Sequence, residues 1–494
     1  MYFSLEADID MTGWIAENNP SQGWQPIGKD SGFRGNFNGN GHIISNLWIK
    51  RPSTDYIGLF GKIDDNAEIL NLKLENAEYV GNDYVGGIVG YCYNANSITS
   101  CEFNGKISGN DYIGGIIGYI DNNGDHDFEV SDCNSYCHIN GRDYIGGICG
   151  YNYNRVHGGE NYRVFISDCL SYSNIDGRDY IGGICGYAYS YSNSGLYDKS
   201  YSYITTSDCY SYNHINGNNS IGGIYGYAYS YSYYFKDSSG FYTKSYSYIT
   251  ASGCYSYNHI NGNNNIGGIS GYTCISDRSG GTYSHITFFD CFTNGRIKGN
   301  ESLGGITGYI ENYGSIGISK CYSNNLMIEG KNYVGGIFGN STENDIQTSK
   351  NVSLNEVISS DNNLYRIGNN GVFDNNLAWV LTQMLLNSAK QPIPDDSGAN
   401  GTSTGLSTLK LQATYEGLGW DFADTWQIEE TESFPYFKNQ TAPPYFQQTL
   451  KKGDTNLSGQ CTEAGTVTVC IGDKVYTVQS SGNTWSLTLD NPLQ

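Results

Sequence analysis

The sequence predicts an all-β protein, a parallel β-helix or solenoid in which each repeat forms one coil, with a projecting fin and a small C-terminal β domain. The first supporting observation is a short motif, an aliphatic residue followed by glycine and usually by a second glycine, that recurs along the chain. Its aliphatic positions are Ile57, Val85, Ile113, Ile145, Ile181, Ile221, Ile266, Leu303 and Val334. The steps between them run from 28 to 45 residues, which is typical of stacked-repeat architectures.

A column of cysteines supplies the second observation. Its members are Cys101, Cys133, Cys169, Cys209, Cys254, Cys291 and Cys321, each 12 residues before the next motif, or 13 for the last. Helical repeats would need a sustained i, i+3, i+4 apolar pattern, and propeller blades need about 40 residues and four strands each. A repeat with one fixed half and one variable half instead favours coils that stack in register and place insertions at a single corner.

The cysteine column predicts a structural ladder, because equivalent positions of successive coils lie ~4.8 Å apart. Disulfides need Cβ atoms about 3.5–4.5 Å apart. Free buried thiols, occasional disulfides between coils and a metal site are therefore three open interpretations of the column. At the glycine pair, we expect either a positive φ or a close approach of neighbouring backbone.

The variable half of the repeat predicts a fin. The distance from each aliphatic marker to the following cysteine runs 16, 20, 24, 28, 33, 25 and 18 residues. A rise of about four per coil lengthens two arms by two residues each and preserves the facing of the strands. We therefore expect a triangular stack of hairpin arms beside the solenoid.

The longest arms alternate tyrosine with serine or alanine, so one face of each strand would be all tyrosine. Such an aromatic wall has two interpretations, cross-strand packing that stabilises an outer sheet or a recognition surface for glycan or protein. The candidate binding residues are Tyr189, Tyr191, Tyr201, Tyr203, Tyr229, Tyr231 and Tyr233.

Composition limits the partners. The chain has 27 basic and 49 acidic residues and a net charge of −22, which disfavours nucleic acids and anionic membranes. No apolar run is long enough to span a bilayer. Met1–Glu6 lacks the basic and apolar regions of a signal peptide, so we expect any targeting segment of an exported protein to lie upstream of this fragment.

Acidic residues also recur at fixed repeat positions. Asp55, Asp83, Asp111, Asp143 and Asp179 form one row, and Asp132, Asp168, Asp208 and Asp290 form another. Aspartate is a common turn residue, although Ca²⁺ or the adjacent Arg142 and Arg178 could relieve repulsion within a row. Three histidines, His138, His214 and His259, each five residues after a column cysteine, are interpreted as repeat positions rather than a site. No catalytic residue, metal set or cofactor motif is identified.

The repeats Asp83–Gly90 and Asp111–Gly118 resemble the GLUG motif of large bacterial surface proteins, which include adhesins and non-catalytic regions of IgA-cleaving metalloproteases. The opening segment from Ala7 to Gly61 and the closing segment with Trp420, Trp426 and Phe434–Phe437 are similar to those of the same family. This resemblance implies a right-handed parallel β-helix, surface display and no catalytic residues.

The resulting division has four parts: capping coils at 1–54, repeats at 55–345, final coils and closing segment at 346–440, and a linker with a partial bacterial Ig-like domain at 441–494. The leading hypothesis is a secreted or cell-surface adhesin or stalk segment, not an enzyme. It would bind a glycan, a host or neighbour-cell surface protein, or a second copy of itself. The alternatives are a β-helix polysaccharide lyase or glycoside hydrolase and a passive structural spacer.

Overall fold

The structure, a computed structural model, is all-β, with 58% of residues in strands and 4% in helices. It describes residues 1–494 except 124–125, 196–198, 234–242, 278–281, 344–345, 393–397, 439–444, 447–454, 461–465, 472–473, 482–483 and 490–494. The chain divides into two compact units, Met1–Ser403 and Thr404–Gln494.

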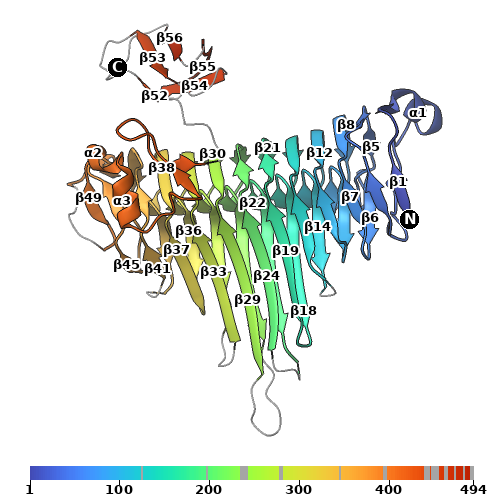
Figure 1. Cartoon of the computed structure of the whole chain (residues 1–494), viewed down its shortest axis with the longest axis horizontal. Helices are drawn as coiled ribbons and strands as arrows, with labels where there is room; N and C mark the ends of the chain where they lie inside the picture. Colours follow the sequence, from blue (N-terminus) through green and yellow to red (C-terminus); the bar gives the residue numbers. More distant parts are fainter. Residues whose placement is uncertain are drawn as a thin grey trace. The chain divides into compact units, whose positions relative to one another are not determined.

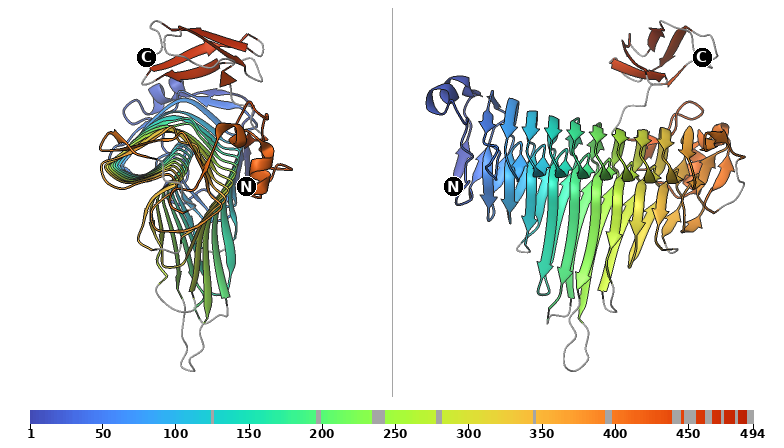
Figure 2. Two further views of the ribbon diagram at one scale, coloured as in Figure 1. Left: turned by 90° about the vertical axis from the view of Figure 1, so that its left-hand side faces the viewer. Right: turned by 180° about the vertical axis from the view of Figure 1, so that it is seen from behind.

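In the first unit the chain passes repeatedly through four long sheets, here called A, B, C and D. One coil runs from sheet D (Val85–Gly86) to C (Val89–Tyr93), A (Ser97–Thr99) and B (Glu102–Ser108), and then returns to D. The strands of the repeated coils pair in parallel with their equivalents in the coils before and after, as in Ile113↔Ile145 and Ile145↔Ile181. Figure 1 and Figure 2 show the coils following one another along one axis. The parallel sheets agree with the predicted β-helix.

Sheets A and C contain the longest strands of the unit. Sheet A consists of β1 (Tyr2–Ser4), β3 (Asn36–Asn38), β7 (Glu68–Leu70), β11 (Ser97–Thr99), β15 (Phe128–Ser131), β19 (Asn161–Ser167), β24 (Lys199–Ser207), β29 (Lys244–Ser252), β33 (Thr282–Phe289), β37 (Ser315–Ser319), β41 (Gln347–Ser349) and β45 (Val372–Asp374). Sheet C consists of β6 (Phe60–Asp64), β10 (Val89–Tyr93), β14 (Ile117–Asn122), β18 (Cys149–His157), β23 (Cys185–Asn193), β28 (Tyr225–Tyr233), β32 (Ser270–Ile275), β36 (Thr307–Glu311) and β40 (Phe338–Ser341).

Sheets D and B complete each coil. Sheet D consists of β9 (Val85–Gly86), β13 (Asp111–Gly114), β17 (Asp143–Gly146), β22 (Asp179–Gly182), β27 (Asn219–Gly222), β31 (Asn264–Gly267), β35 (Glu301–Gly304), β39 (Asn332–Gly335) and β44 (Leu364–Tyr365). Sheet B consists of β2 (Ile9–Asp10), β4 (Ile43–Ser45), β5 (Trp48–Lys50), β8 (Lys73–Val80), β12 (Glu102–Ser108), β16 (Asn134–Asn140), β20 (Leu170–Ser171), β21 (Asn174–Asp176), β25 (Tyr210–Ser211), β26 (His214–Asn216), β30 (Tyr255–Asn261), β34 (Phe292–Lys298), β38 (Tyr322–Glu329), β42 (Val352–Ser353), β43 (Val357–Ser360), β46 (Leu377–Trp379), β47 (Gln383–Leu386), β48 (Ala389–Lys390) and β49 (Thr402–Thr404).

The first unit also has a helix that the sequence pattern did not predict. Helix α1 (Met11–Asn18) begins where the Asp10 side chain accepts a hydrogen bond from the Thr12 N–H, as an N-cap residue does. Met11 and Ile15 face the apolar core.

The second unit, described by itself, begins with α2 (Leu406–Leu409), α3 (Gln412–Gly417) and the antiparallel pair β50 (Trp426–Gln427) and β51 (Tyr436–Phe437). Trp426 is fully buried, and its ring centroid lies 4.7 Å from that of Trp420 and 4.4 Å from that of Phe437. Residues of the predicted closing segment therefore form a small aromatic core.

Two small antiparallel sheets follow within the second unit. One contains β52 (Tyr445–Phe446), β53 (Asn456–Gln460) and β56 (Thr484–Thr488), and the other contains β54 (Thr466–Ile471) and β55 (Lys474–Gln479). They agree with the predicted small C-terminal β domain, and the Ig-like fold stays a prediction. Cys461 and Cys470, nine residues apart in the sequence, could close a disulfide in an oxidising compartment, and Cys461 lies outside the described residues.

The structure shows which of the two expected reasons, positive φ or close approach of neighbouring backbone, explains the glycine pairs. A Cβ placed on Gly147 would lie 2.0 Å from Ser171 Oγ and 2.1 Å from the carbonyl oxygen of Gly183 in the next coil. Close approach is therefore the reason for glycine here. The positive φ falls instead on the residue before the aliphatic marker, such as Tyr144 at 59° and Tyr180 at 60°.

The core contains stacked rows of identical or similar side chains. The seven column cysteines are fully buried, and all cysteines among the described residues of the first unit are free thiols. Column neighbours are joined through the backbone, as where the Leu170 N–H donates to the Cys133 carbonyl at 3.0 Å. Burial raises the pKa of Cys101, Cys209 and Cys291 well above the usual value. The described structure thus has the ladder of free thiols, one of the three interpretations left open.

Candidate functional site

The predicted fin is present, and it is built as a two-layer sandwich. The insertions lie between sheets C and A, so the arms are the long strands β18, β23 and β28 on one side and β19, β24 and β29 on the other. Figure 1 and Figure 2 show these arms extending beyond the coils, with the longest in the middle.

The expectation of hairpin arms is corrected by the pairing of the strands. The two arms of a coil belong to different sheets, and each arm pairs in parallel with the equivalent arm of the neighbouring coil, as in β23 with β28 and β24 with β29. The stacking that orders the coils therefore continues along the described arms as far as the pairs Asn193↔Tyr233 and Lys199↔Lys244.

Serine fills the space between the two layers of the fin. Ser190, Ser192, Ser200 and Ser202 are fully buried. The hydroxyls of Ser190 and Ser202 lie 2.8 Å apart, and the Ser192 hydroxyl donates to the Ser200 carbonyl at 2.9 Å. The serine hydroxyls form hydrogen bonds with each other across the gap and with backbone carbonyls. These buried polar groups of the sandwich therefore have partners although their side chains are small.

Tyrosine covers both outer faces of the fin. Sheet C presents Tyr189, Tyr191, Tyr229, Tyr231 and Tyr233, and sheet A presents Tyr201 and Tyr203. The structure therefore brings the seven predicted residues to the fin but divides them between opposite faces. Register pairs Tyr189 with Tyr229, and Tyr201 and Tyr203 with Tyr246 and Tyr248.

The rings stack on one another along the coil axis. Centroids lie 4.6 Å apart for Tyr201 and Tyr246 and 4.8 Å apart for Tyr203 and Tyr248, with planes within 10° of parallel. Arg163 lies over the Tyr203 ring at 5.0 Å, and the His285 ring stacks on Tyr248. Neighbouring side chains thus cover the ring faces within this row, and the ring edges and hydroxyls are what the row presents outward.

Desolvation raises the pKa of two of the fin tyrosines, Tyr189 and Tyr248. Burial raises the pKa of Tyr248 to about 12, with neighbouring tyrosines adding to the shift. It also raises the pKa of Tyr189 above its usual value. At neutral pH Tyr189 and Tyr248 therefore present protonated hydroxyls that can donate as well as accept hydrogen bonds.

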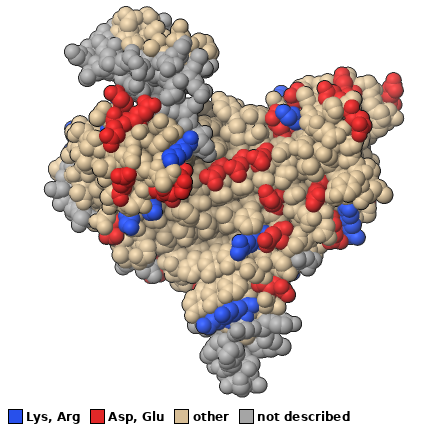
Figure 3. Space-filling model, in the orientation of Figure 1, with Lys and Arg blue, Asp and Glu red and all other residues tan. Residues whose placement is uncertain are grey.

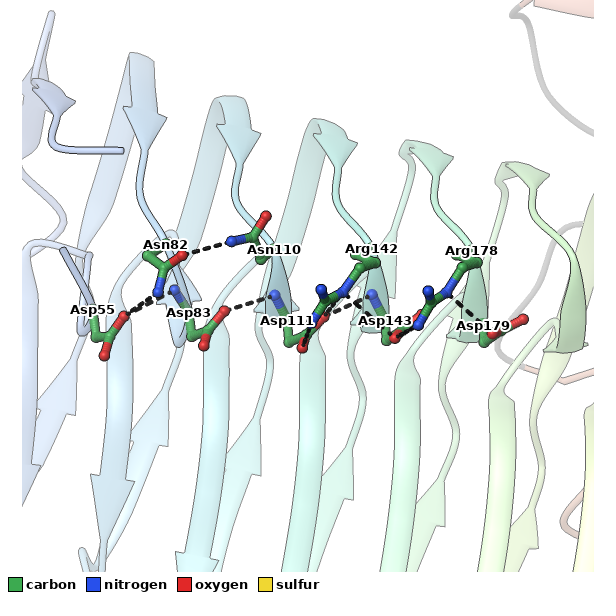
Figure 4. Close-up of polar contacts among 9 residues, drawn as sticks. All are labelled: Asp55, Asn82, Asp83, Asn110, Asp111, Arg142, Asp143, Arg178 and Asp179. Carbon is green, nitrogen blue, oxygen red and sulfur yellow. Dashed lines mark hydrogen bonds and ion pairs between the residues drawn. The ribbon is translucent and has the colours of Figure 1, made fainter. Parts of the chain in front are cut away.

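The first aspartate row forms a hydrogen-bonded ladder on the first strands of sheet D, shown in Figure 4. The backbone N–H of Asp111 donates to Asp83 Oδ1 at 3.2 Å, and that of Asp143 donates to Asp111 Oδ1 at 3.2 Å. Arg142 binds Asp111 through two nitrogens, and Arg178 binds Asp143 in the same way. The carboxylates raise the pKa of both guanidinium groups. Backbone donors and the two arginines therefore account for this row.

The second aspartate row occupies left-handed turns. The φ angles are 53° at Asp132, 54° at Asp168, 51° at Asp208 and 49° at Asp290, and aspartate tolerates this region better than most residues. This supports the interpretation of the row as turn residues.

Asp208 in this row predicts a pH dependence of stability. Burial raises the pKa of Asp208 from 3.8 to about 6, and the neighbouring Cys254 and Asp168 add smaller increases. A raised carboxyl pKa means that the folded state holds the proton more tightly. The contribution of Asp208 to the stability of the folded state is therefore most favourable below pH 4 and is lost as pH rises through 6. We expect Asp208→Asn to stabilise the protein by about 1 kcal/mol at pH 7, after allowance for partial exposure, and to have little effect at pH 4. Urea unfolding of both proteins at the two pH values measures this, and an equal difference at both would contradict it.

Ca²⁺ binding along the aspartate rows stays a hypothesis from the sequence, beside the interpretation of the rows as turn residues. Within the described ranges, no group of three or more His, Cys, Asp or Glu side chains is arranged to hold a metal ion.

Sequence reasoning missed a buried asparagine ladder inside the coils. Asn213 Oδ1 accepts from the Ser173 N–H at 2.6 Å and from the Ser171 hydroxyl at 3.1 Å, while Nδ2 donates to the Ser211 hydroxyl at 2.8 Å. Asn258 repeats this arrangement one coil later. The recurrence of Ser-x-Asn after the column cysteine was the available signal.

Charge is distributed unevenly over the surface. In Figure 3 acidic side chains are scattered over the body, and the visible face of the fin carries fewer charged groups. Lys199 and Lys244 are exposed and in register at the end of sheet A strands in the fin. None of the described helices is long and apolar enough to cross a membrane.

Comparison with known proteins gives short matches. No known family matches the chain. It is 39% identical over 90 residues to a Gly-rich membrane protein of Evansella cellulosilytica, a match that covers 18% of this chain and 10% of that protein. It is 39% identical over 93 residues to halomucin of Haloquadratum walsbyi, covering 18% of this chain and 1% of halomucin. The chain thus spans a tenth or less of these relatives.

One solved structure also aligns with most of the chain. It is a crystal structure described as an immunoglobulin A1 protease from Bacteroides ovatus, with 18% identity and coverage of 89% of this chain and 86% of that one. The TM-score of this alignment is 0.26.

Proposed function

We propose that this chain is a non-catalytic segment of a bacterial cell-surface or secreted protein, related to the GLUG-repeat adhesins, that binds a protein partner through its tyrosine-covered fin. The names of the two relatives, a membrane protein and halomucin, fit an extracellular setting. The right-handed coil sense and the Ig-like module belong to the same proposal.

The observation that carries the proposal is the inverted polarity of the fin. Burial of apolar surface is the main favourable term in folding, yet here small serines lie inside and tyrosines lie outside. Tyr189, Tyr191, Tyr201 and Tyr203 remain partly exposed although Ser190 and Ser202 are fully buried. A sandwich that needed aromatic side chains only for its own core would place them in the interior.

The ring geometry on the sheet A face favours protein over sugar as the partner of that face of the fin. Sugars stack on open ring faces, whereas the rows of Tyr201 and Tyr203 have their faces against neighbouring rings. Phenol edges and hydroxyls on a rigid sheet suit the irregular polar surface of a protein, as tyrosine and serine do in antibody binding loops.

The experiment removes hydroxyls without removing rings. The variant carries Phe at Tyr201, Tyr203, Tyr246 and Tyr248. The control carries Phe at Tyr112 and Tyr144, which lie on the sheet D strands β13 and β17. Both are measured with the parent protein against immobilised fibronectin, collagen and mucin, against a glycan array, and for self-association by sedimentation. We expect at least about tenfold weaker protein binding for the fin variant alone.

Equal binding by parent and fin variant would refute the fin as the binding surface. Binding confined to the glycan array, and lost in the fin variant, would refute the protein partner. Retention of the parent melting temperature and circular dichroism spectrum by the fin variant shows that its fold is intact.

A further inference from the structure

The outer face of sheet B carries a second ordered surface, far from the fin in the coil. Four successive coils repeat a Ser-Tyr-x-His/Asn-Ile-Asn/Asp segment, whose tyrosine, fourth and sixth positions point outward. The outward residues are Tyr136, His138 and Asn140; Tyr172, Asn174 and Asp176; Tyr212, His214 and Asn216; and Tyr257, His259 and Asn261. We call these twelve residues the sheet B track.

Register aligns the track along the coil axis. His138 pairs with Asn174, Asn174 with His214, and His214 with His259. Asn140, Asp176, Asn216 and Asn261 form the next row in the same way. In Figure 1 the strands that carry the track, among them β21 and β30, lie along the edge opposite the fin. The three steps between four coils span roughly 14 Å.

Aromatic rings in the track are farther apart and more inclined than the stacked rings on the sheet A face of the fin. The Tyr172 and Tyr212 centroids are 6.4 Å apart with planes inclined by 33°, and those of Tyr212 and Tyr257 are 6.3 Å apart and inclined by 42°. Tyr172 is 63% exposed and Tyr136 is 36% exposed. The wider, tilted spacing leaves ring surface that a ligand can cover.

Polar side chains beside these rings form a hydrogen-bonded row. Asn216 Nδ2 donates to Asp176 Oδ1 at 2.9 Å, and Asn261 Nδ2 donates to Asn216 Oδ1 at 3.1 Å. The imidazole rings of His214 and His259 stack with centroids 5.0 Å apart. His138, Asn174, Asp176, His214 and Asn216 line a shallow hollow of 380 Å³. These groups are thus held in place before a ligand arrives.

We propose that the sheet B track binds an extended linear polysaccharide lying along the coil axis. Tyrosine rings would cover sugar faces while the adjoining amide, imidazole and carboxylate groups bind hydroxyls. The coil spacing is close to the length of one sugar in an extended chain, so successive sugars would meet equivalent side chains. An extended peptide fits less well, because the strand backbones here are paired within sheet B and offer no free edge for strand addition.

The test measures the binding of soluble polysaccharides to the whole chain by affinity electrophoresis. Galactomannan and hydroxyethyl cellulose are the neutral probes, alginate and polygalacturonate the acidic ones. The variants are Tyr172→Ala and the pair His138→Ala and His214→Ala. The control is the four-position Phe variant of the fin, so a failure of the fin proposal leaves this measurement unaffected.

We expect the parent and the fin variant to be retarded equally by at least one polysaccharide, and each track variant to bind at least tenfold more weakly. Oligosaccharides of that polymer should bind more tightly as they lengthen to about four sugars and then level off. Retardation of the parent by none of the four probes, or unchanged retardation of both track variants, would overturn the proposal. Tyr172→Phe, which retains the ring, should bind as the parent does and guards against a folding defect.

Discussion

Replacement of Gly183 by valine should destabilise the solenoid by at least about 4 kcal/mol. Overpacking of a closely packed site is among the few causes of an effect this large. A Cβ on Gly183 would lie 2.0 Å from Ser211 Oγ, 2.2 Å from the Gly223 carbonyl oxygen and 2.8 Å from Asn213 Nδ2. The carbonyl oxygen belongs to the next coil and cannot rotate away. The coils must separate locally, which breaks the register that all outer layers share.

Thermal and urea unfolding measure the effect of Gly183→Val. The matched control is Gly13→Val in helix α1, where a Cβ would meet nothing within 4 Å. We expect the control to stay within about 0.5 kcal/mol of the parent. Equal unfolding midpoints for Gly183→Val and the parent would show that the coils are not stacked as closely as described.

Replacement of Asn213 by alanine should have the second-largest effect, about 3 kcal/mol of destabilisation. Asn213 is 1% exposed, and its loss leaves the Ser173 N–H and the Gly183 carbonyl without the partners they have at 2.6 Å and 3.1 Å. A buried donor or acceptor left unsatisfied costs about 1–3 kcal/mol, and the vacated volume adds to that cost.

Asn263→Ala is the control for Asn213→Ala, because Asn263 is exposed and donates along an outer row to Asn218 at 3.1 Å. The two variants should differ in unfolding free energy by more than about 2 kcal/mol. Similar losses would mean that the interior amide ladder contributes no more than a surface one.

Much of the solenoid could be predicted from the sequence, because its constraints are local and repeated. The nearly constant spacing from each column cysteine to the next aliphatic marker reflects two sheets, B and D, whose strands pair with their equivalents in neighbouring coils. The variable spacing reflects the one corner where a longer chain can leave the stack. Helix α1 escaped prediction because it lies before the first repeat and has no such periodicity.

The internal structure of the fin was harder to predict, because an alternating Tyr-Ser pattern does not state which face is inside. The two-residue alternation of side chains along the strand shows which face is inside. Ile204 is fully buried in the coil, so Ser202 and Ser200, two and four residues before it on the same strand, face inward, and Tyr203 and Tyr201 face outward. The prediction of hairpin arms was wrong because a rise of about four residues per coil lengthens both arms equally. Two facing sheets require the same equal lengthening.

The sheet B track was visible in the sequence but was interpreted differently. His138, His214 and His259 were assigned to repeat positions, which is correct, and repetition was taken to exclude a site. In a stacked architecture a repeated outward residue becomes a row on one face, and a row is what a linear ligand needs. The tyrosines two residues earlier complete the pattern.

The proposals for the fin depend on serine facing inward and tyrosine facing outward, and thiol labelling tests this most directly. Ser202→Cys and Tyr203→Cys place a thiol at adjacent positions of β24, and each variant is treated in the folded state with a charged thiol reagent, with the parent as the background. We predict rapid labelling at position 203 and no labelling above background at position 202 until urea unfolds the protein. Faster labelling at 202 than at 203 would contradict the description of the fin and its role in binding.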